Sequence, residues 1–559
     1  MGVKPTCRLP RVLTAAAFLC LIVAAGFQTM QSGALELTIV DGDSGLPTPA
    51  RIELVDNDGK GCIADDALLT GGDCSHCSGL PECPELSQAM LEKLPLRQSK
   101  TITNNYTRTN QFYSTGKSRF ASLPAGSYAL RVYKGFEFNV AERRFRIGSG
   151  EDLKVTVPLS RWINLEQQGW YSADDHLHIP RPVTALNPSL SKWMQAEDVR
   201  VANLLQLGES TEFQSSPQYA FGKQSWYREG DYLLATGQEN PRTDFRGHGI
   251  ILGANSAVNF PNAYLIYSKF WGEAKRQGAL SGYAHLGVAV GATYGLAIDL
   301  PSGLLDFLEV LQFTFGEQWW AWYEILNTGF RLAPTAGTDY PCLPSYPGAE
   351  RFYTKVEGPL TYEAWLEGVR RGRTFVTNGP MLEFRVAGKD MGDEVLFDKP
   401  ATVTVEGRIR FDPSRDSIHA LELVEKGEIL RSFPRLNNSA EISFRVPYEV
   451  KSSSWLAVRA RGQKMSEAPF RLSLAHSAPV YVTLRGAPPL SQQPLAKTMA
   501  RIWLARLADF KARLAEDKVQ YLLSPSGPET TEAVIRRDRT ALLREIEVAR
   551  AKYLDLAGR

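Results

Sequence analysis

The sequence is poor in histidine and has no strong excess of charge of either sign. Its 559 residues include only seven histidines, and 63 basic residues against 61 acidic ones leave a formal net charge of +2. The basic residues are dispersed, so the chain lacks the positive patch of a nucleic-acid-binding protein, and we expect no nucleic acid among its partners. Neither the GxSxG motif of serine hydrolases nor a phosphate-binding P-loop occurs, which argues against those enzyme classes.

Long hydrophobic runs are absent after the first residues of the chain. Lys4, Arg8 and Arg11 precede the run VLTAAAFLCLIVAAGF, and the small residues of Ser32–Ala34 follow it. This order is typical of a signal peptide, and the run is shorter than the roughly 20 residues that a spanning helix needs. We therefore predict a cleaved signal peptide over residues 1–34, a periplasmic or secreted protein and no stable membrane insertion. The alternative is an uncleaved membrane anchor.

Four of the seven cysteines are crowded within 22 residues: Cys62, Cys74, Cys77 and Cys83. In an exported protein such crowding favours two disulfides that close a loop. The alternative is a zinc knuckle that uses His76, although the second CxxC pair of such a site is missing. Cys342 is left over, and we expect a free, buried thiol there.

The length and the 43% of hydrophobic residues allow several cores, so we expect about three or four domains. Over residues 35–160, apolar and polar residues alternate between Asp-Gly and Ser-Gly turns, which predicts a β-sandwich. The stretch LPAGSYALRV resembles the closing hairpin of carboxypeptidase-regulatory-like or transthyretin-like sandwiches. The cysteine-rich insertion interrupts this sandwich between about residues 61 and 109.

Residues 161–391 change to short apolar runs that alternate with helical patterns. The predicted buried parallel strands are VANLLQL, YLLATGQ, GIILGAN, GALSGYAH, FLEVLQF and RLAPTAG, and the predicted helices are YLIYSKFWGEAKRQG and YEAWLEGVRRG. Such alternation predicts an α/β barrel or a doubly wound sheet. In both architectures the functional residues gather at the carboxyl ends of the strands.

The C-terminal third returns to strands and then ends in helices. Residues 392–490 carry alternating patterns without a helix between them, which predicts a second β-sandwich. Residues 491–559 predict a helical hairpin, because large apolar residues recur on one face of each helix. These residues are Trp503, Leu507, Phe510 and Leu514 in the first helix, and Ile535, Leu542, Ile546 and Tyr553 in the second.

Four of the seven histidines fall in the central segment, each beside the end of a predicted strand. The stretch YSADDHLHIPRP places His176 and His178 two residues apart, directly after Asp174 and Asp175. In a strand, residues i and i+2 point to the same side, so both imidazoles can face one metal ion. Taken alone, such a pair is a weak signal.

The ends of the other predicted strands carry further ligand types. They are Glu239 in GQE, His248 in GHG, His285 in YAH and Asp339 in GTD. Each one alone is more often structural: a satisfied core histidine, a loop carboxylate or a helix N-cap. Together they favour a site for zinc, manganese or iron, and a bridging carboxylate would suit two ions.

The motifs DDHLH, GQE, GHG, YAH and GTD, in that order, resemble those of the polymerase-and-histidinol-phosphatase (PHP) metallohydrolases. GWYSADDHLH, GRTFVTNGP and AHSAPVYV resemble more closely the CehA/McbA-like branch, over residues Gly169 to Val482. The resemblance implies a distorted PHP-type β/α barrel, here flanked by the two β-sandwiches and followed by the helical hairpin.

The resemblance also implies a ligand set for two divalent metal ions. His176, His178, Glu239 and Asp339 would hold one ion, and Glu239, His248 and His285 would hold the second, so that Glu239 bridges them. Asp174 would orient a ligating histidine. Many members have further histidines where this chain has Glu209 and Pro341, and we therefore expect two ions rather than three.

These observations predict an exported metal-dependent hydrolase. A metal-activated water would attack an ester, carbamate, amide or phosphoester bond of a small-molecule or polymer-derived substrate. Glu239, Asp339 and Asp174 would serve catalysis, and Tyr340, Arg181 or Arg242 would stabilise the developing oxyanion. The alternative for each of these last three is a surface or packing role. The alternative is a non-catalytic, metal-containing binding or scaffold protein that contacts polysaccharide or another protein.

Overall fold

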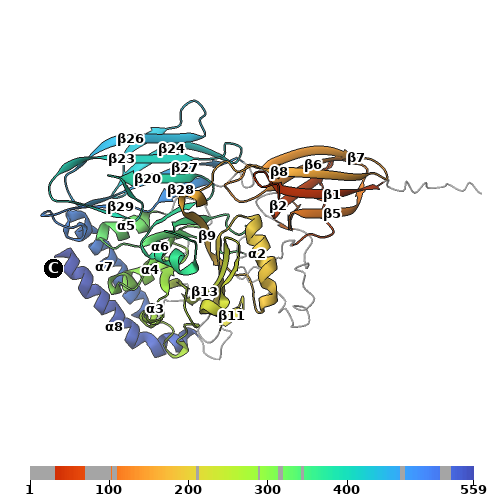
Figure 1. Cartoon of the computed structure of the whole chain (residues 1–559). Coiled ribbons are helices and arrows are strands. Elements are labelled where there is room, and N and C mark those ends of the chain that lie inside the picture. The colour runs from red at the N-terminus through yellow and green to blue at the C-terminus, as the bar shows by residue number, and fades with distance from the viewer. Residues whose placement is uncertain are drawn as a thin grey trace, which may run out of the picture.

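The protein is a mixed α/β, sheet-rich molecule with several sheets (Figure 1). The computed structural model describes residues 32–68, 102–103, 110–208, 213–243, 245–286, 290–312, 319–340, 345–465, 472–515 and 531–558. No helix within these ranges is long and apolar enough to cross a membrane. Most of the predicted signal peptide lies outside them, so export stays a prediction.

The N-terminal domain packs two sheets against each other. One contains β5 (Lys117–Pro124), β1 (Ser32–Asp41) and β8 (Asp152–Leu159); the other contains β3 (Ile102–Thr103), β4 (Asn110–Ser114), β2 (Ala50–Asp56), β6 (Gly126–Tyr133) and β7 (Ala141–Ile147). Leu35, Leu37 and Ile39 are buried between the sheets, as the alternation predicts. The two sheets with this shared core form a β-sandwich.

The start of β1 moves the predicted N-terminal boundary. Ser32 pairs with Pro124, and Ala34 pairs with Asp152, so Ser32–Ala34 form part of the sandwich. The predicted boundary after residue 34 is therefore too late. In the cysteine-rich insertion only Cys62 is described, half-buried; Cys74, Cys77, Cys83 and His76 lie outside the described residues, and the disulfides stay a prediction.

The central domain is built on one curved sheet. Its strands are β9 (Trp170–Leu177), β10 (Val201–Gly208), β11 (Phe213–Ser215), β12 (Tyr227–Glu229), β13 (Tyr232–Thr243), β14 (Gly247–Leu252), β15 (Leu280–Tyr283), β16 (Phe307–Leu311), β17 (Ala333–Ala336), β18 (Arg351–Lys355) and β19 (Thr374–Thr377). β10 lies between β9 and β13 and is parallel to both. β16 lies between β15 and β17 and is likewise parallel to both. A bridge from Leu177 to Tyr340 brings the chain after β17 back to β9.

One strand that was predicted to be parallel to its neighbours is antiparallel to them. β14, which contains GIILG, pairs antiparallel with both β13 and β15, so its prediction as a parallel strand is wrong. The connection from Thr243 to Gly247 is too short for a crossover between parallel strands, and it allows only a hairpin.

Helices cover the central sheet. They are α2 (Asn187–Ala196), α3 (Tyr267–Arg276), α4 (Val290–Asp299), α5 (Trp320–Thr328) and α6 (Tyr362–Arg370). Both predicted helices are present, as α3 and α6. α6 begins at a Thr361 cap, whose hydroxyl accepts the Ala364 N–H at 3.1 Å.

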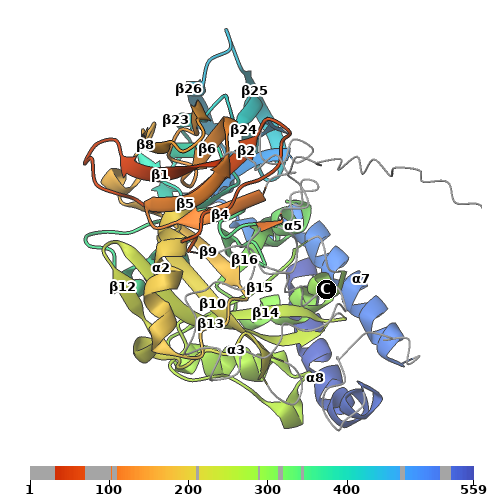
Figure 2. The same ribbon diagram turned by 90° about the vertical axis from the view of Figure 1, so that its right-hand side faces the viewer.

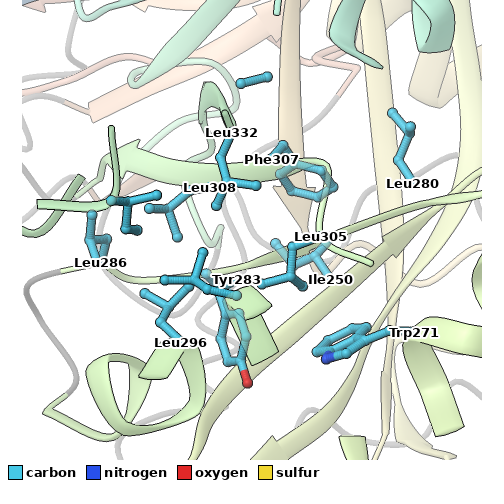
Figure 3. Close-up of a cluster of buried hydrophobic side chains, with 14 of the residues drawn as sticks. Ile250, Trp271, Leu280, Tyr283, Leu286, Leu296, Leu305, Phe307, Leu308 and Leu332 are labelled. Atoms are coloured by element: carbon cyan, nitrogen blue, oxygen red, sulfur yellow. The ribbon is translucent and has the colours of Figure 1, made fainter. Parts of the chain in front are cut away.

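The largest hydrophobic core lies between the sheet and helices α3 to α6. Ile250, Tyr283 and Phe307 from three neighbouring strands belong to it (Figure 3), and the Trp271 ring of α3 packs on the Tyr283 ring with the centroids 5.6 Å apart. Gly249 is required for this contact, because a Cβ at that position would lie 2.3 Å from the Trp271 ring. The core fixes the strands whose ends carry the predicted ligands.

The C-terminal sandwich starts earlier than residue 392. One sheet contains β21 (Lys389–Asp390), β20 (Met381–Val386), β23 (Ala401–Arg410) and β26 (Glu441–Val450); the other strands are β22 (Glu394–Phe397), β24 (Asp416–Glu425), β25 (Glu428–Pro434), β27 (Ser454–Lys464), β28 (Leu472–Ser477) and β29 (Val480–Leu484). β28 also pairs with β19, so the hydrogen bonding of the central sheet continues into this sandwich.

The helical hairpin consists of α7 (Pro494–Ala515) and α8 (Thr531–Ala557), which lie along one side of the central domain (Figure 2). The two predicted apolar faces are buried there. Polar contacts anchor the hairpin as well: Arg246 pairs with Glu545 at 2.8 Å, and Asp538 accepts the Leu265 N–H at 3.0 Å.

Candidate metal centre

The six predicted ligands come together at one end of the central sheet. His176 and His178 lie at the end of β9, Glu239 in β13 and His248 in β14, while two ligands follow strand ends, His285 after β15 and Asp339 after β17. The side chain of His248 is 12% exposed, and the other five are more deeply buried. Buried groups of this composition could hold a metal ion.

Four donor atoms form a first group around His176 and His178. Their Nε2 atoms are 3.1 Å apart. Asp339 Oδ1 lies 3.3 Å and 3.1 Å from these two nitrogens, and Glu239 Oε2 lies 3.6 Å and 3.1 Å from them. Donors about 2.0–2.1 Å from a tetrahedral ion stand roughly 3.3 Å apart. His176, His178 and Asp339 form a buried group that could hold an ion, and Glu239 Oε2 lies within 3.6 Å of both imidazoles.

The second oxygen of Glu239 faces a second group. Glu239 Oε1 lies 2.7 Å from His248 Nδ1 and 3.4 Å from His285 Nε2, and these two nitrogens are 3.1 Å apart. These three donor atoms lie within 3.4 Å of one another, and Glu239 and His285 also form, with His176, a buried group that could hold an ion. One oxygen of the carboxylate thus faces each group, as the resemblance implies for a bridging ligand.

The site concentrates opposite charges out of water. Burial lowers the pKa of His176, but the carboxylates of Glu309 and Asp339 outweigh it and hold that pKa well above the ordinary value. Burial raises the pKa of Glu239, while Arg242 and His248 outweigh it and hold that pKa well below the usual range. Ionised carboxylates here require positive charge on the facing groups, from protons or from a cation.

Glu309 on β16 orients two of the ligands, and the sequence analysis missed it. Its Oε1 lies 2.9 Å from His176 Nδ1, a contact that fixes the ring with Nε2 toward the ligand group. Its Oε2 accepts the backbone N–H of His285 at 3.1 Å. Gln312 likewise contacts His285 Nδ1 at 2.5 Å. The signal was present in FLEVLQF, where a glutamate interrupts an apolar strand and requires a buried partner.

Asp174 ties the His176 backbone to the segment that carries Asp339. It accepts the backbone N–H of His176 at 3.0 Å, both the N–H (3.2 Å) and the hydroxyl (2.7 Å) of Thr338, and the N–H of Gly348 at 2.8 Å. Burial raises its pKa to about 6 against these bonds. These bonds go to backbone groups and to a threonine hydroxyl, so Asp174 fixes the segment before Asp339; its predicted role in orienting a histidine ring stays a prediction.

The GTD motif is explained by crowding and by backbone conformation. A Cβ at Gly337 would lie 2.5 Å from the Cβ of His176 and 2.7 Å from Asp175 Oδ1, so only glycine fits. Burial and the nearby Glu309 raise the pKa of Asp175 well above its usual range. Asp339 and His285 both adopt left-handed backbone, with φ of 54° and 57°. Such conformations in non-glycine residues cluster at functional sites.

The three predicted oxyanion stabilisers lie in different surroundings. Arg242 is beside the ligands, with its Nε 3.6 Å from Glu239 Oε1 and its side chain 20% exposed. Arg181 is fully buried and donates to Thr236 at 2.8 Å and to Asn187 at 3.3 Å; burial lowers its pKa to about 10. These hydrogen bonds go to residues outside the ligand set, which fits the packing alternative for Arg181.

Tyr340 supports the site through its backbone. Its carbonyl accepts the His178 N–H at 2.8 Å, and its ring packs edge-to-face on Trp193 with the centroids 5.4 Å apart. These contacts give it a positioning role; they do not test the predicted catalytic one. Glu209 and Pro341 lie outside the described residues, so the expectation of no third ion stays a prediction.

The two remaining motifs of the resemblance join domains. In TNGP, Asn378 donates to the Leu472 carbonyl at 2.8 Å and accepts the Leu474 N–H at 2.8 Å, which holds β28. In AHS, the fully buried His476 donates from Nδ1 to the Ser477 carbonyl at 2.8 Å and accepts the Tyr323 hydroxyl at 2.6 Å. Neither side chain reaches the ligands through these contacts.

No family model and no curated protein matches this chain. A crystal structure of an engineered protein is similar at 12% identity over 53% of this chain and 52% of that chain, with a TM-score of 0.14. The match spans about half of that chain, and at this TM-score it carries no argument about fold.

Proposed function

We propose that this chain is a metal-dependent hydrolase of the PHP type, similar to the CehA/McbA-like branch, with two divalent ions per chain. The observation that carries the proposal is the Glu239 carboxylate, whose two oxygens face two separate groups of nitrogen and oxygen donors at ligand spacing. Imidazole and carboxylate donors without cysteine suit zinc, manganese or iron.

The arrangement of strands supports a distorted PHP-type β/α barrel. Two sets of parallel strands, β9–β10–β13 and β15–β16–β17, are joined through the antiparallel β14. The Leu177–Tyr340 bridge connects the last of these strands back to the first. Ligands at carboxyl ends of parallel strands are the usual arrangement of barrel active sites.

The chemistry divides between the ions and the chain. Bound ions would lower the pKa of a water molecule and polarise the scissile oxygen. The chain's residues hold and orient: Glu309 fixes the His176 ring, and Asp174 fixes the segment of Asp339. Arg242, one-fifth exposed beside Glu239, is placed to stabilise negative charge that develops on a substrate oxygen.

The proposed substrates contain ester, carbamate, amide or phosphoester bonds, in small molecules or fragments of polymers, encountered after export. The test is a screen of purified protein, with bound metals quantified, against aryl ester, carbamate, phosphomonoester and phosphodiester substrates. We expect turnover of at least one class that is lost on chelation and in Glu239→Gln. Glu229→Gln, a carboxylate of β12 paired with Lys192, is the control and should retain activity. Bound metal without any turnover would favour the binding or scaffold role instead.

A further inference from the structure

The N-terminal sandwich reaches into the central domain through Arg51. This residue lies on β2, and its side chain is 1% exposed. Its Nε donates to Glu197 Oε1 at 2.6 Å, and its Nη1 donates to Gln111 at 2.7 Å. The Tyr113 hydroxyl of the same sandwich donates to that Glu197 oxygen at 2.7 Å. Glu197 follows α2 of the central domain, so these buried, charge-assisted bonds fix the two domains relative to each other.

The same two residues hold the segment from Tyr346 to Arg351. The Arg51 guanidinium lies over the Tyr346 ring, 4.0 Å from its centroid. The backbone carbonyl of Glu197 accepts from Arg351 Nη2 at 2.9 Å, and Arg351 Nε donates to the Gly348 carbonyl at 2.6 Å. The segment is therefore fixed at both of its ends by contacts that depend on the domain boundary.

Gly348 connects this segment to the metal centre through Asp174. Its N–H donates to Asp174 Oδ2 at 2.8 Å, and the same Asp174 oxygen accepts the Thr338 hydroxyl. Position 348 requires glycine, because a Cβ there would lie 2.5 Å from Val199 and its φ is 74°. Thr338 directly precedes the ligand Asp339.

We propose that Arg51 is a positioning residue for the metal centre, acting through Tyr346, Gly348 and Asp174 on the segment that carries Asp339. This inference rests on the proposed metal centre and extends it, since it makes the N-terminal sandwich a part of the site rather than an appended module. Groups that orient ligands from outside a metal site typically change metal affinity about 10- to 100-fold when they are removed.

The test uses the full mature chain and two substitutions at the boundary. Arg51→Lys keeps the charge beside Glu197 but loses the planar fork and the stack on Tyr346. Tyr346→Leu removes the ring without leaving a buried charge unpaired. Arg131→Met is the matched control, because Arg131 belongs to the same sandwich and forms an exposed ion pair with Glu142. Zinc affinity is measured by competition with a chromophoric chelator, and ligand geometry by the visible absorption of the Co²⁺-loaded protein.

We expect both boundary variants to bind zinc about 10- to 100-fold more weakly and to shift the Co²⁺ spectrum, with the circular dichroism of the wild type. Arg131→Met should match the wild type in all three measurements. If Arg51→Lys does not fold, Tyr346→Leu decides the question. Boundary variants with wild-type affinity and an unchanged spectrum would overturn this inference alone, whereas a wild-type protein that binds no metal would overturn the proposed function itself.

Discussion

Single buried carboxylates define this site as much as the ligands do. Glu309 contacts the ring of His176 and the backbone of His285, and so joins the two donor groups from a third strand. Asp174 joins His176 to Thr338 in the same way. Both lie beyond the donor atoms, and both act by limiting where those atoms can be.

Glu309→Gln tests this role. Glutamine keeps the size of the side chain but removes its negative charge, which attracts the His176 Nδ1–H. It also removes one of the two oxygens, so the contacts with His176 and with the His285 N–H can no longer both be made to a carboxylate oxygen. We expect zinc affinity to fall about 10- to 100-fold, measured by chelator competition. Glu324→Gln, on α5 and paired with Arg506, is the control and should bind zinc as the wild type does. If Glu309→Gln and Glu324→Gln bind zinc with equal affinity, Glu309 does not orient the ligands.

At this scale the sequence predicted the donors better than their supports. His176 and His178 follow from strand alternation, and the other ligands follow from polar residues at the ends of apolar runs. The contact between Glu309 and His176 depends on strands far apart in the chain, which no local pattern encodes. For the same reason the sequence could not decide between a site role and a packing role for Arg181, which lies three residues after His178 and donates to Thr236 and Asn187.

Among the elements, β28 and α5 meet at a histidine that titrates far from its ordinary range. Burial lowers the pKa of His476 from 6.5 to about 3, and Arg459 adds to this effect. As the pH falls, the unfolded chain binds the proton first. The stability that neutral His476 contributes is therefore complete above about pH 6.5, and it is lost by about 1.4 kcal/mol per pH unit between pH 6.5 and 3.

His476→Gln should remove this pH dependence, because glutamine can donate to the Ser477 carbonyl and accept from Tyr323 without titrating. We expect the variant to be less stable than the wild type at pH 7, and the difference in unfolding free energy to narrow by about 2 kcal/mol at pH 5. Urea unfolding at the two pH values measures both quantities. If the unfolding free energies of the wild type and the variant fall by the same amount between pH 7 and pH 5, His476 does not titrate in this way.

Element types were predicted more reliably than their directions and limits. The apolar runs became β10, β13, β15, β16 and β17, and the helical patterns became α3 and α6. The direction of β14 was wrong because it depends on the length of a connection and not on the run itself. β20 fell outside the predicted sandwich, since its pairing with β23 is not visible in its own sequence.

In the whole molecule, the helical hairpin supports the central domain through one buried cation. Arg246 is fully buried and pairs with Asp299 at 2.7 Å and with Glu545 of α8 at 2.8 Å. Glu545→Gln should lower the free energy of unfolding by about 2 kcal/mol, because a charge-assisted bond to a buried group is weakened. Glu547→Gln on the same helix weakens only exposed pairs, with Lys511 and Arg550, and should change stability by less than about 0.5 kcal/mol. Urea midpoints compare the two; equal midpoints would contradict the role of Glu545.

The N-terminal sandwich limits where a signal peptide can end. β1 pairs from Ser32 onward, so cleavage after Ala34 would remove paired residues. We expect mass spectrometry of exported protein to find a mature N-terminus at or before Ser32, with the apolar run removed. An exported chain that retains Met1, or one that begins after Ala34, would show this prediction to be wrong.

The central claim is that Glu239 couples two ions, and metal content tests it most directly. We expect about two divalent ions per wild-type chain, about one in His285→Ala and less than one in Glu239→Ala, because the bridging carboxylate serves both groups. Inductively coupled plasma mass spectrometry of the three proteins, after removal of loosely bound metal, gives these counts. Circular dichroism checks that the sandwiches remain folded. Three tightly bound ions per wild-type chain, or wild-type metal content in Glu239→Ala, would contradict the account.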